Sequence, residues 1–342
     1  MRSVENPKNR FEPAEIEWED GEAPLALLHV HEERSKTILS ENDSPDLGFR
    51  FSINPYRGCQ HACAYCYARP SHQYWGFGAG TDFDREIIVK VNAPELLREA
   101  FARKSWKGQS ITFSGNTDCY QPLEGRYRLT RQLLSICLEH KNPVAIITKS
   151  PLIRRDLDVL SALAREARLT VFMSIAFADD ETARAIEPGA PAIHRRFEAL
   201  RALSDAGIET GVAMAPIIPG LNDKDIGKVL QRAHEAGARH AFRTLLRLPA
   251  EVKPVFLTRL RAARPLAADK IEHAIRDVRG GELYDNRFGA RMHGEGARWR
   301  AVEELFDLQC KRLGLNADRD DESAGAEEPS TFERPGAQLK LF

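Results

Sequence analysis

The sequence predicts an α/β protein built around a partial (β/α)6, TIM-like barrel, and three observations support this prediction. The chain has 342 residues, 42% of them hydrophobic, so it has ample material for a large core. Six apolar, strand-like segments alternate with amphipathic segments of helical periodicity, a pattern typical of a parallel sheet with crossover helices. Six such units fall short of the eight that close a complete barrel.

The expected elements follow from local patterns of apolar residues. Strands are expected at 50–57, 110–115, 143–149, 169–177, 209–217 and 238–248, with a further extended stretch at 86–92. Helices are expected at 93–104, 127–140, 152–167, 192–207 and 223–237, and helical patterns also occupy 251–276 and 296–314.

These elements divide the chain into four regions. Residues 1–48 form an acidic extension that we expect to be partly irregular, and residues 49–250 form the barrel. Residues 251–315 form a helical C-terminal region, which we expect to cover the barrel mouth and to contribute to substrate binding. Residues 316–342 are polar and acidic and contain Pro and Gly, so we expect a disordered tail.

Composition and charge narrow the class of protein. The net charge is −1, but residues 51–312 alone carry +9 between two acidic ends. This basic body is compatible with a polyanionic substrate, and equally with a solvated, Arg-rich surface. No apolar run is long enough for a membrane helix, and the N-terminus lacks the apolar stretch of a secretion signal. Six cysteines do not form a disulfide scaffold, so we expect a cytoplasmic protein.

Three of the six cysteines predict an inorganic centre. Cys59, Cys63 and Cys66 form the pattern C-x3-C-x2-C on a segment that follows the first barrel strand. Three thiolates so close in sequence can hold three irons of a [4Fe–4S] cluster and leave the fourth iron open to an exchangeable ligand. The alternative is zinc, which needs a fourth ligand from His61, His72 or Cys119.

This cysteine pattern, with an aromatic residue before its last cysteine and six β/α units around it, resembles the radical S-adenosylmethionine superfamily. The resemblance implies that the open iron binds the amino and carboxylate groups of S-adenosylmethionine. It further implies that the reduced cluster cleaves this cofactor to a 5′-deoxyadenosyl radical, which abstracts a hydrogen atom from the substrate. A reductase or a flavodoxin-like protein is the expected electron donor.

The resemblance also assigns candidate cofactor residues. The segment SGNTD follows the second strand at the place where the superfamily contacts the cofactor's amino group, although its GGE-type signature is absent; it comprises Ser114, Gly115, Asn116, Thr117 and Asp118. Lys149 and Ser174 end the third and fourth strands, where barrel sites are built, and are expected to bind the methionyl carboxylate and the ribose. The alternative for Lys149 is a solvent-facing residue at the end of a strand.

Several longer motifs are similar to the branch of the superfamily that contains spore photoproduct lyase, which reverses a thymine photolesion in DNA. They are NPYRGCxHxCxYCYAR, VKVN, SGNTDxYQPxE, ITKS, MSI and APIIPGLND. In that branch, tyrosines that match Tyr65 and Tyr67 are proposed to relay a hydrogen atom. Its hydrogen-donating cysteine would fall near Gly115 or Asn116, where this chain has none; Cys119 is the candidate substitute, or a packed core residue.

The expected function is therefore radical repair or modification of a nucleobase in DNA. The alternatives are a radical enzyme that acts on RNA or a peptide, and a zinc-stabilised module that binds nucleic acid. The segment 279–296 is rich in Gly and Arg and could wrap a phosphate or a flipped nucleotide, or be a flexible surface loop. His29 and His31 could be read as a metal-binding pair, but an isolated pair of this kind in an acidic extension usually binds no metal.

The last five residues, Gln338–Phe342, read QLKLF. They resemble the short peptide with which bacterial DNA-repair and replication proteins bind the DNA polymerase sliding clamp. Leu339, Leu341 and Phe342 offer apolar anchors at the end of a flexible linker. The sequence therefore predicts the clamp as a partner, with a tail that folds back onto its own core as the alternative.

Overall fold

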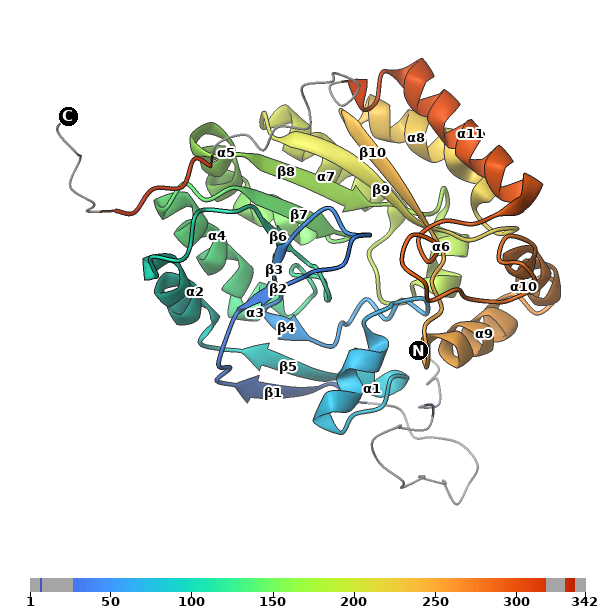
Figure 1. Ribbon diagram of the computed structural model, residues 1–342, viewed down its shortest axis with the longest axis horizontal. Coiled ribbons are helices and arrows are strands. Elements are labelled where there is room, and N and C mark those ends of the chain that lie inside the picture. Colours follow the sequence, from blue (N-terminus) through green and yellow to red (C-terminus); the bar gives the residue numbers. More distant parts are fainter. Residues whose placement is uncertain (1–6, 8–26, 318–329, 336–342) are drawn as a thin grey trace.

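The computed structural model describes residues 7, 27–317 and 330–335, and its centre is a seven-stranded sheet (Figure 1). The strand order is β10-β9-β8-β7-β6-β3-β2, and only β2 is antiparallel to its neighbour. The strands are β2 (Leu39–Glu41), β3 (Phe51–Ile53), β6 (Ile111–Phe113), β7 (Val144–Thr148), β8 (Leu169–Ser174), β9 (Glu209–Ile217) and β10 (His240–Leu245). The prediction of six parallel strands in an incomplete barrel is confirmed, because β10 and β2 remain separate edges.

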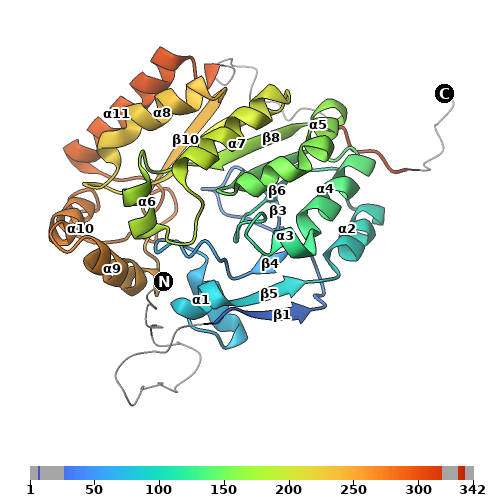
Figure 2. The ribbon, with the colours of Figure 1, turned by 180° about the vertical axis from the view of Figure 1, so that it is seen from behind.

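Helices cover the outer face of this sheet and leave its C-terminal end free for a site (Figure 2). They bury continuous apolar faces, as the six-unit pattern predicts. The helices between strands are α2 (Ala93–Ala102), α3 (Glu124–Tyr127), α4 (Leu129–Glu139), η2 (Pro151–Asp156), α5 (Leu157–Glu166), α6 (Asp180–Ile186), α7 (Ile193–Asp205), η3 (Asp223–Asp225) and α8 (Ile226–Glu235). The C-terminal region adds α9 (Val252–Ala263), α10 (Ala268–Asp277) and α11 (Gly296–Leu313).

A second, three-stranded sheet lies beside the barrel and uses part of the N-terminal extension. Its order is β1-β5-β4, with β1 at His29–Glu33, β5 at Glu86–Lys90 and β4 at Tyr56–Arg57. The single strand expected at 50–57 is therefore wrong in one respect: β3 and β4 belong to different sheets. Pro55 separates them, and a proline has no N–H with which to continue a ladder. The short helices η1 (Arg69–Trp75) and α1 (Thr81–Arg85) lead into β5.

Two expected helical stretches are interrupted. The stretch at 251–276 consists of α9 and α10, with Pro265 between them; the residue before a proline is disfavoured in a helix, which explains the break. The stretch at 127–140 begins only at Leu129, because Arg128 takes the left-handed conformation at φ +52°. Both breaks shorten helices without changing the order of the elements.

Residues 330–335 pack against the body of the protein, so the prediction of a disordered tail at 316–342 is wrong for these residues. The ring of Phe332 packs edge-on against Phe101, and the guanidinium of Arg334 donates to the backbone oxygens of Arg103 (2.9 Å) and Trp106 (2.8 Å). These contacts join parts of the chain that are more than 200 residues apart, which a local sequence pattern does not reveal. The segment QLKLF lies outside the described residues.

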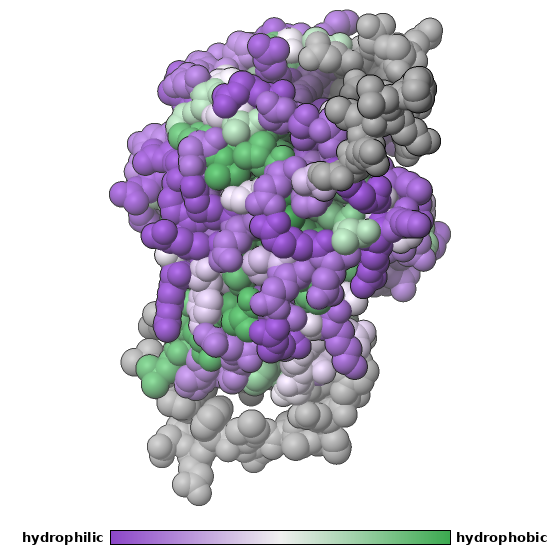
Figure 3. All heavy atoms as spheres, turned by 90° about the vertical axis from the view of Figure 1, so that its left-hand side faces the viewer, coloured by the Kyte–Doolittle hydropathy of each residue, from purple (hydrophilic) through white to green (hydrophobic). Residues whose placement is uncertain are grey.

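The surface seen from the side of the model in Figure 3 is mostly hydrophilic, and hydrophobic side chains gather there in a few separate patches. In the part of the chain that the structure describes, no helix is both long and apolar enough to span a bilayer.

Candidate functional site

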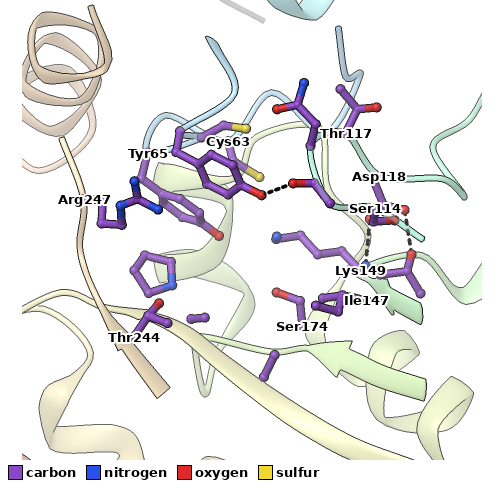
Figure 4. A pocket seen from close by; sticks show the side chains of 18 of the residues that line it. Cys63, Tyr65, Ser114, Thr117, Asp118, Ile147, Lys149, Ser174, Thr244 and Arg247 are labelled. Carbon is purple, nitrogen blue, oxygen red and sulfur yellow. Dashed lines mark hydrogen bonds between the residues drawn. The ribbon is translucent and has the colours of Figure 1, made fainter. Parts of the chain in front are cut away.

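One cavity of about 250 Å³ lies at the C-terminal ends of the parallel strands (Figure 4). Parallel strands direct the loops that follow them to the same edge of the sheet, so residues distant in sequence meet there. Almost all the predicted site residues line this cavity: Cys59, Cys63, Tyr65, Cys66, Tyr67, Ser114, Gly115, Asn116, Thr117, Asp118, Lys149 and Ser174. Figure 4 shows Lys149 reaching into the space from one side and Arg247 from the other.

The cluster loop, residues 58–68, follows an irregular path that close backbone contacts fix. Gly58 has φ +74°, and a side chain there would place its Cβ 2.9 Å from the backbone oxygen of Phe83. The loop after α6 supports it from the other side: a Cβ on Gly189 would lie 2.1 Å from the backbone oxygen of Gln60. Only glycine fits these two approaches, so the path of the cluster loop is set by sequence.

Three free thiols of the cluster loop face the cavity, those of Cys59, Cys63 and Cys66. Burial raises the pKa of Cys63 to about 12, although the ammonium of Lys149 opposes this rise. Neutral thiols of this kind become thiolates when a cationic metal centre binds, so the donor set fits an iron–sulfur centre. Within the described residues, no three His, Cys, Asp or Glu side chains gather as a single metal ion would need them. The three thiols therefore line the same cavity but do not converge on a position for a single metal ion.

Asp118 organises the floor of the cavity. Its carboxylate accepts hydrogen bonds from Thr148 Oγ1 (2.7 Å) and the backbone N–H of Lys149 (2.9 Å), and His61 Nδ1 lies 3.3 Å away. Burial alone would raise the pKa of Asp118, but His61 and these donors lower it well below its usual range. The aspartate thus ties the cluster loop to the ends of β6 and β7, and acts here as a support.

The rest of the predicted SGNTD segment is held by one asparagine. Asn54 Oδ1 accepts hydrogen bonds from the backbone N–H groups of Asn116 (2.7 Å) and Thr117 (3.3 Å). Ser114 takes φ +70°, and a Cβ on Gly115 would approach Ser52 at 2.7 Å. The segment therefore presents a fixed backbone to the cavity.

Lys149 and Ser174 reach the cavity from the ends of β7 and β8, as predicted. The Lys149 ammonium lies 5.7 Å from the ring centroid of Tyr65. Burial alone would lower the pKa of Lys149, but the Cys63 sulfur in its thiolate form and the carboxylate of Glu187 raise it above its ordinary value. A permanently charged lysine in a buried cavity is suited to bind a carboxylate or phosphate group.

The structure does not bring Cys119 to the cavity, which corrects the prediction that it donates a hydrogen atom there. Cys119 is fully buried in the hydrophobic core and does not line the cavity. Its backbone N–H donates to Ser114 Oγ (2.9 Å), so the chain turns inward directly after the SGNTD segment. His72, one candidate zinc ligand, is also absent from the lining, because it stacks on Phe77 beside Phe83.

Three functional side chains, those of Glu187, Arg196 and Arg247, escaped the sequence analysis because only the fold reveals them, and His61 was expected there only as a candidate zinc ligand. Glu187 accepts a hydrogen bond from the Tyr65 hydroxyl and forms an ion pair with Arg196, whose Nη2 lies 2.6 Å away. Both Glu187 and Arg196 are buried. His61 pairs with Asp118, as described above. Arg247 lines the cavity from the segment after β10, where a lone arginine carries no local signal.

Comparisons with known proteins agree with this geometry. The sequence model of the Radical SAM superfamily matches residues 53–233. An uncharacterised protein of Mycobacterium tuberculosis is 36% identical over 241 residues, 70% of this chain and 71% of the relative. An uncharacterised protein of Methanocaldococcus jannaschii is 34% identical over 176 residues, 52% of this chain and 63% of the relative. The radical SAM Nα-GlyT isomerase of a Pseudomonas phage is 25% identical over 209 residues, 60% of this chain and 41% of that protein.

Solved structures of spore photoproduct lyase have the same fold. One mutant of that enzyme superimposes with a TM-score of 0.58 at 18% identity, covering 84% of this chain and 80% of the lyase. Another, with bound AdoMet and dinucleoside spore photoproduct, superimposes with a TM-score of 0.57 at 17% identity and the same coverage. The predicted likeness to that branch is confirmed at the level of the fold.

Proposed function

Since this chain belongs to the radical SAM superfamily and is therefore a radical SAM enzyme, we propose that it repairs or modifies a nucleobase in DNA. Membership implies a [4Fe–4S] cluster and S-adenosylmethionine. When bound and reduced, the cluster supplies the electron that cleaves this cofactor to methionine and a 5′-deoxyadenosyl radical. The remaining tasks, which are binding, orientation and exclusion of water, belong to the side chains of the cavity.

The proposed roles follow the positions of these side chains. Cys59, Cys63 and Cys66 bind iron, one thiolate each. Lys149 neutralises the carboxylate of the methionyl group, and Ser174 contacts the ribose. The 114–118 segment presents its fixed backbone to the amino group. Tyr65 and Tyr67 are the candidates for hydrogen-atom transfer, and the Tyr67 hydroxyl donates to the backbone oxygen of Gly115 at 2.5 Å.

The observation that carries the proposal is the arrangement of two adjoining cavities. The cavity with the three cysteines shares Tyr67 and Arg247 with a second cavity of about 1080 Å³. A reactive centre beside a larger, polar-lined space suits a substrate that presents one part of itself to the radical. The basic character of residues 51–312 and the fold shared with spore photoproduct lyase support a nucleic acid as that substrate.

The test is an anaerobic assay of the reconstituted, reduced enzyme with S-adenosylmethionine. We expect 5′-deoxyadenosine to form, and to form faster when UV-irradiated DNA is added than with unirradiated DNA. Formation indifferent to either DNA, but stimulated by RNA or a peptide, would contradict the DNA proposal and retain radical chemistry. One zinc per chain and no iron would contradict both.

Matched cysteine variants locate the iron. Cys66→Ala is expected to lose most of the bound iron and all 5′-deoxyadenosine formation, because one iron loses its thiolate. Cys310→Ala removes a sulfur from the core packing of α11, away from the cavity, and is expected to retain both iron and activity. Equal iron content in the two variants would refute the assignment of Cys66.

We also propose the DNA polymerase sliding clamp as a partner, through Gln338–Phe342. The support is the QLKLF sequence alone, since these residues lie outside the described structure. Deletion of 338–342 is expected to abolish binding to a purified bacterial clamp and to leave 5′-deoxyadenosine formation unchanged. Clamp binding that survives this deletion would refute the proposal.

A further inference from the structure

The second cavity, called here the outer cavity, is a built part of the fold. Its main wall is the mouth loop, residues 278–295, between α10 and α11. The guanidinium of Arg279 donates to four backbone oxygens: those of Leu246 (3.0 Å), Ala290 (2.9 Å), Arg291 (3.0 Å) and His293 (2.8 Å). These four hydrogen bonds fix the mouth loop from within. This Gly- and Arg-rich stretch is therefore not the flexible surface loop that the sequence analysis gave as an alternative.

Most of the cationic side chains around the outer cavity already have partners. The two Nη atoms of Arg279 donate to backbone oxygens, while its Nε has no partner among the described residues, and Arg291 forms an ion pair with Asp46. Arg287 pairs with Asp285 at 2.6 Å, and His293 Nδ1 lies 3.6 Å from Glu303. Each of these groups therefore already has an acceptor or a carboxylate of the protein beside it.

Arg247 differs from them. Its guanidinium lies over the ring of Tyr67, 5.4 Å from the centroid, and makes no hydrogen bond or ion pair with any described residue. Its Nε is buried without a partner, in the wall that the two cavities share. A partly buried guanidinium without an acceptor is costly, and the planar fork of its N–H groups matches two oxygens of a phosphate.

We propose that Arg247 binds a backbone phosphate of the nucleic-acid substrate in the outer cavity and so places the adjoining base at the mouth of the cofactor cavity. This inference rests on the proposed function and names the residue that positions its substrate. The volume of the outer cavity supports it, because about 1080 Å³ is at the upper end of the range for ligand sites and exceeds the need of a single base.

The salt dependence of binding tests this contact directly. The oxidised, reconstituted enzyme with S-adenosylmethionine is titrated with a fluorescent oligothymidylate at several salt concentrations. Each phosphate contact adds about 0.7 to the slope of log affinity against log salt for a single strand. Arg247→Gln is expected to reduce the slope by about 0.7 and to weaken binding at least ten-fold. Arg247→Lys keeps the charge and is expected to keep the slope.

Arg195→Gln is the matched control. It removes the same charge from an exposed position on α7, outside the lining of both cavities, and is expected to leave the slope unchanged. A melting curve for each variant verifies folding, and if Arg247→Gln does not fold, Arg247→Met, which is also neutral and keeps the apolar stem beside Tyr67, is expected to show the same reduced slope.

Three outcomes would overturn the inference, and they differ in what else they affect. An unchanged slope in Arg247→Gln shows that Arg247 meets no phosphate, while the proposed function stands. An unchanged slope together with lost affinity for S-adenosylmethionine assigns Arg247 to the cofactor carboxylate. A wild-type enzyme that binds no oligonucleotide contradicts the proposed DNA substrate, and this inference falls with it.

Discussion

Two irregular loops border the site, and one buried arginine organises each of them in a different way. Next to the cluster loop, Arg69 at the start of η1 donates to the backbone oxygens of Cys63 (2.9 Å) and Gly80 (2.7 Å) and forms an ion pair with Asp84 (2.9 Å). In the mouth loop, Arg279 donates only to backbone oxygens.

The difference is one of charge. The cluster loop is fixed by a neutralised arginine, whereas the hydrogen-bond partners of Arg279 are all uncharged, and burial lowers its pKa. The cluster loop can therefore hold thiols in a charge-balanced shell. In the mouth loop, the charge of Arg279 is balanced only through space, by carboxylates of the same loop such as Asp285 and Glu295.

The largest expected effect comes from breaking the charged pair. Arg69→Met leaves Asp84 buried without its partner, so we expect a loss of about 3–5 kcal/mol in the free energy of unfolding. Iron content should fall as well, because the Cys63 oxygen loses a donor. Urea denaturation and iron analysis measure both effects. The double variant Arg69→Met/Asp84→Asn should recover part of the stability; no recovery would mean that the charge of Asp84 is not the cause.

The second prediction concerns pH near the cluster loop. Burial lowers the pKa of His72 to about 4, from 6.5. Between these values the unfolded chain binds more protons than the folded chain, so the stability that neutral His72 provides is complete above 6.5 and is lost as pH falls toward 4. The loss amounts to about 1.4 kcal/mol per pH unit, or roughly 3 kcal/mol in all.

His72→Phe tests this sign, since the site is bordered by Phe77 and Phe83 and accepts a ring. At pH 7 we expect the variant to be somewhat less stable than the wild type, because the hydrogen bond between the His72 ring and the backbone of Glu86 is lost. Urea denaturation at pH 4.5 should show the variant relatively more stable than at pH 7. A difference that does not change with pH would contradict the assigned shift.

The third prediction is the counterpart for the mouth loop. Arg279→Met removes donors from neutral backbone oxygens and leaves no unpaired charge, so we expect a smaller loss of about 1–3 kcal/mol. Hydrogen exchange should accelerate in residues 287–293, while iron content stays at the wild-type level. A loss of iron equal to that in Arg69→Met would erase the proposed distinction between the two loops.

The smallest expected effect is at the edge of the mouth loop. Asp46 accepts a hydrogen bond from the backbone N–H of Gly289 (2.7 Å) and pairs with Arg291. Asp46→Asn keeps the shape and weakens both contacts. We expect faster hydrogen exchange at Gly289 with no measurable change in melting temperature. Asp43→Asn, on the same segment between β2 and β3 as Asp46, is the control and is expected to leave the exchange at Gly289 unchanged.

The sequence predicts the architecture well because each β/α unit carries its own signal. Most of the parallel strands are buried apolar runs that alternate with amphipathic helices, so the order and number of the six strands follow from local patterns. The position of the site follows too, because strand ends carry Lys149, Ser174 and the 114–118 segment. Pro55 and Pro265 indicate the breaks between β3 and β4 and between α9 and α10, although the predicted strand 50–57 and the predicted helix 251–276 run through them.

What the sequence does not predict depends on contacts between distant segments. Glu187 supports Tyr65 across 122 residues, and nothing near either residue indicates the partner. Arg247 becomes notable only because the fold leaves it unpaired between two cavities. Cys119 is the opposite case: its position in sequence suggests a hydrogen donor, while the inward turn after Asp118 makes it a core residue.

The packing of residues 330–335 has a consequence for how a partner bound to the C-terminal segment would hold the enzyme. This segment lies against α2 and the chain before β6 and β7, at the N-terminal ends of the strands (Figure 1). The two cavities lie at the C-terminal ends. A carrier protein attached beyond residue 335 would thus hold the enzyme by the end away from its entrance, so that recruitment and access of the substrate do not compete for the same surface.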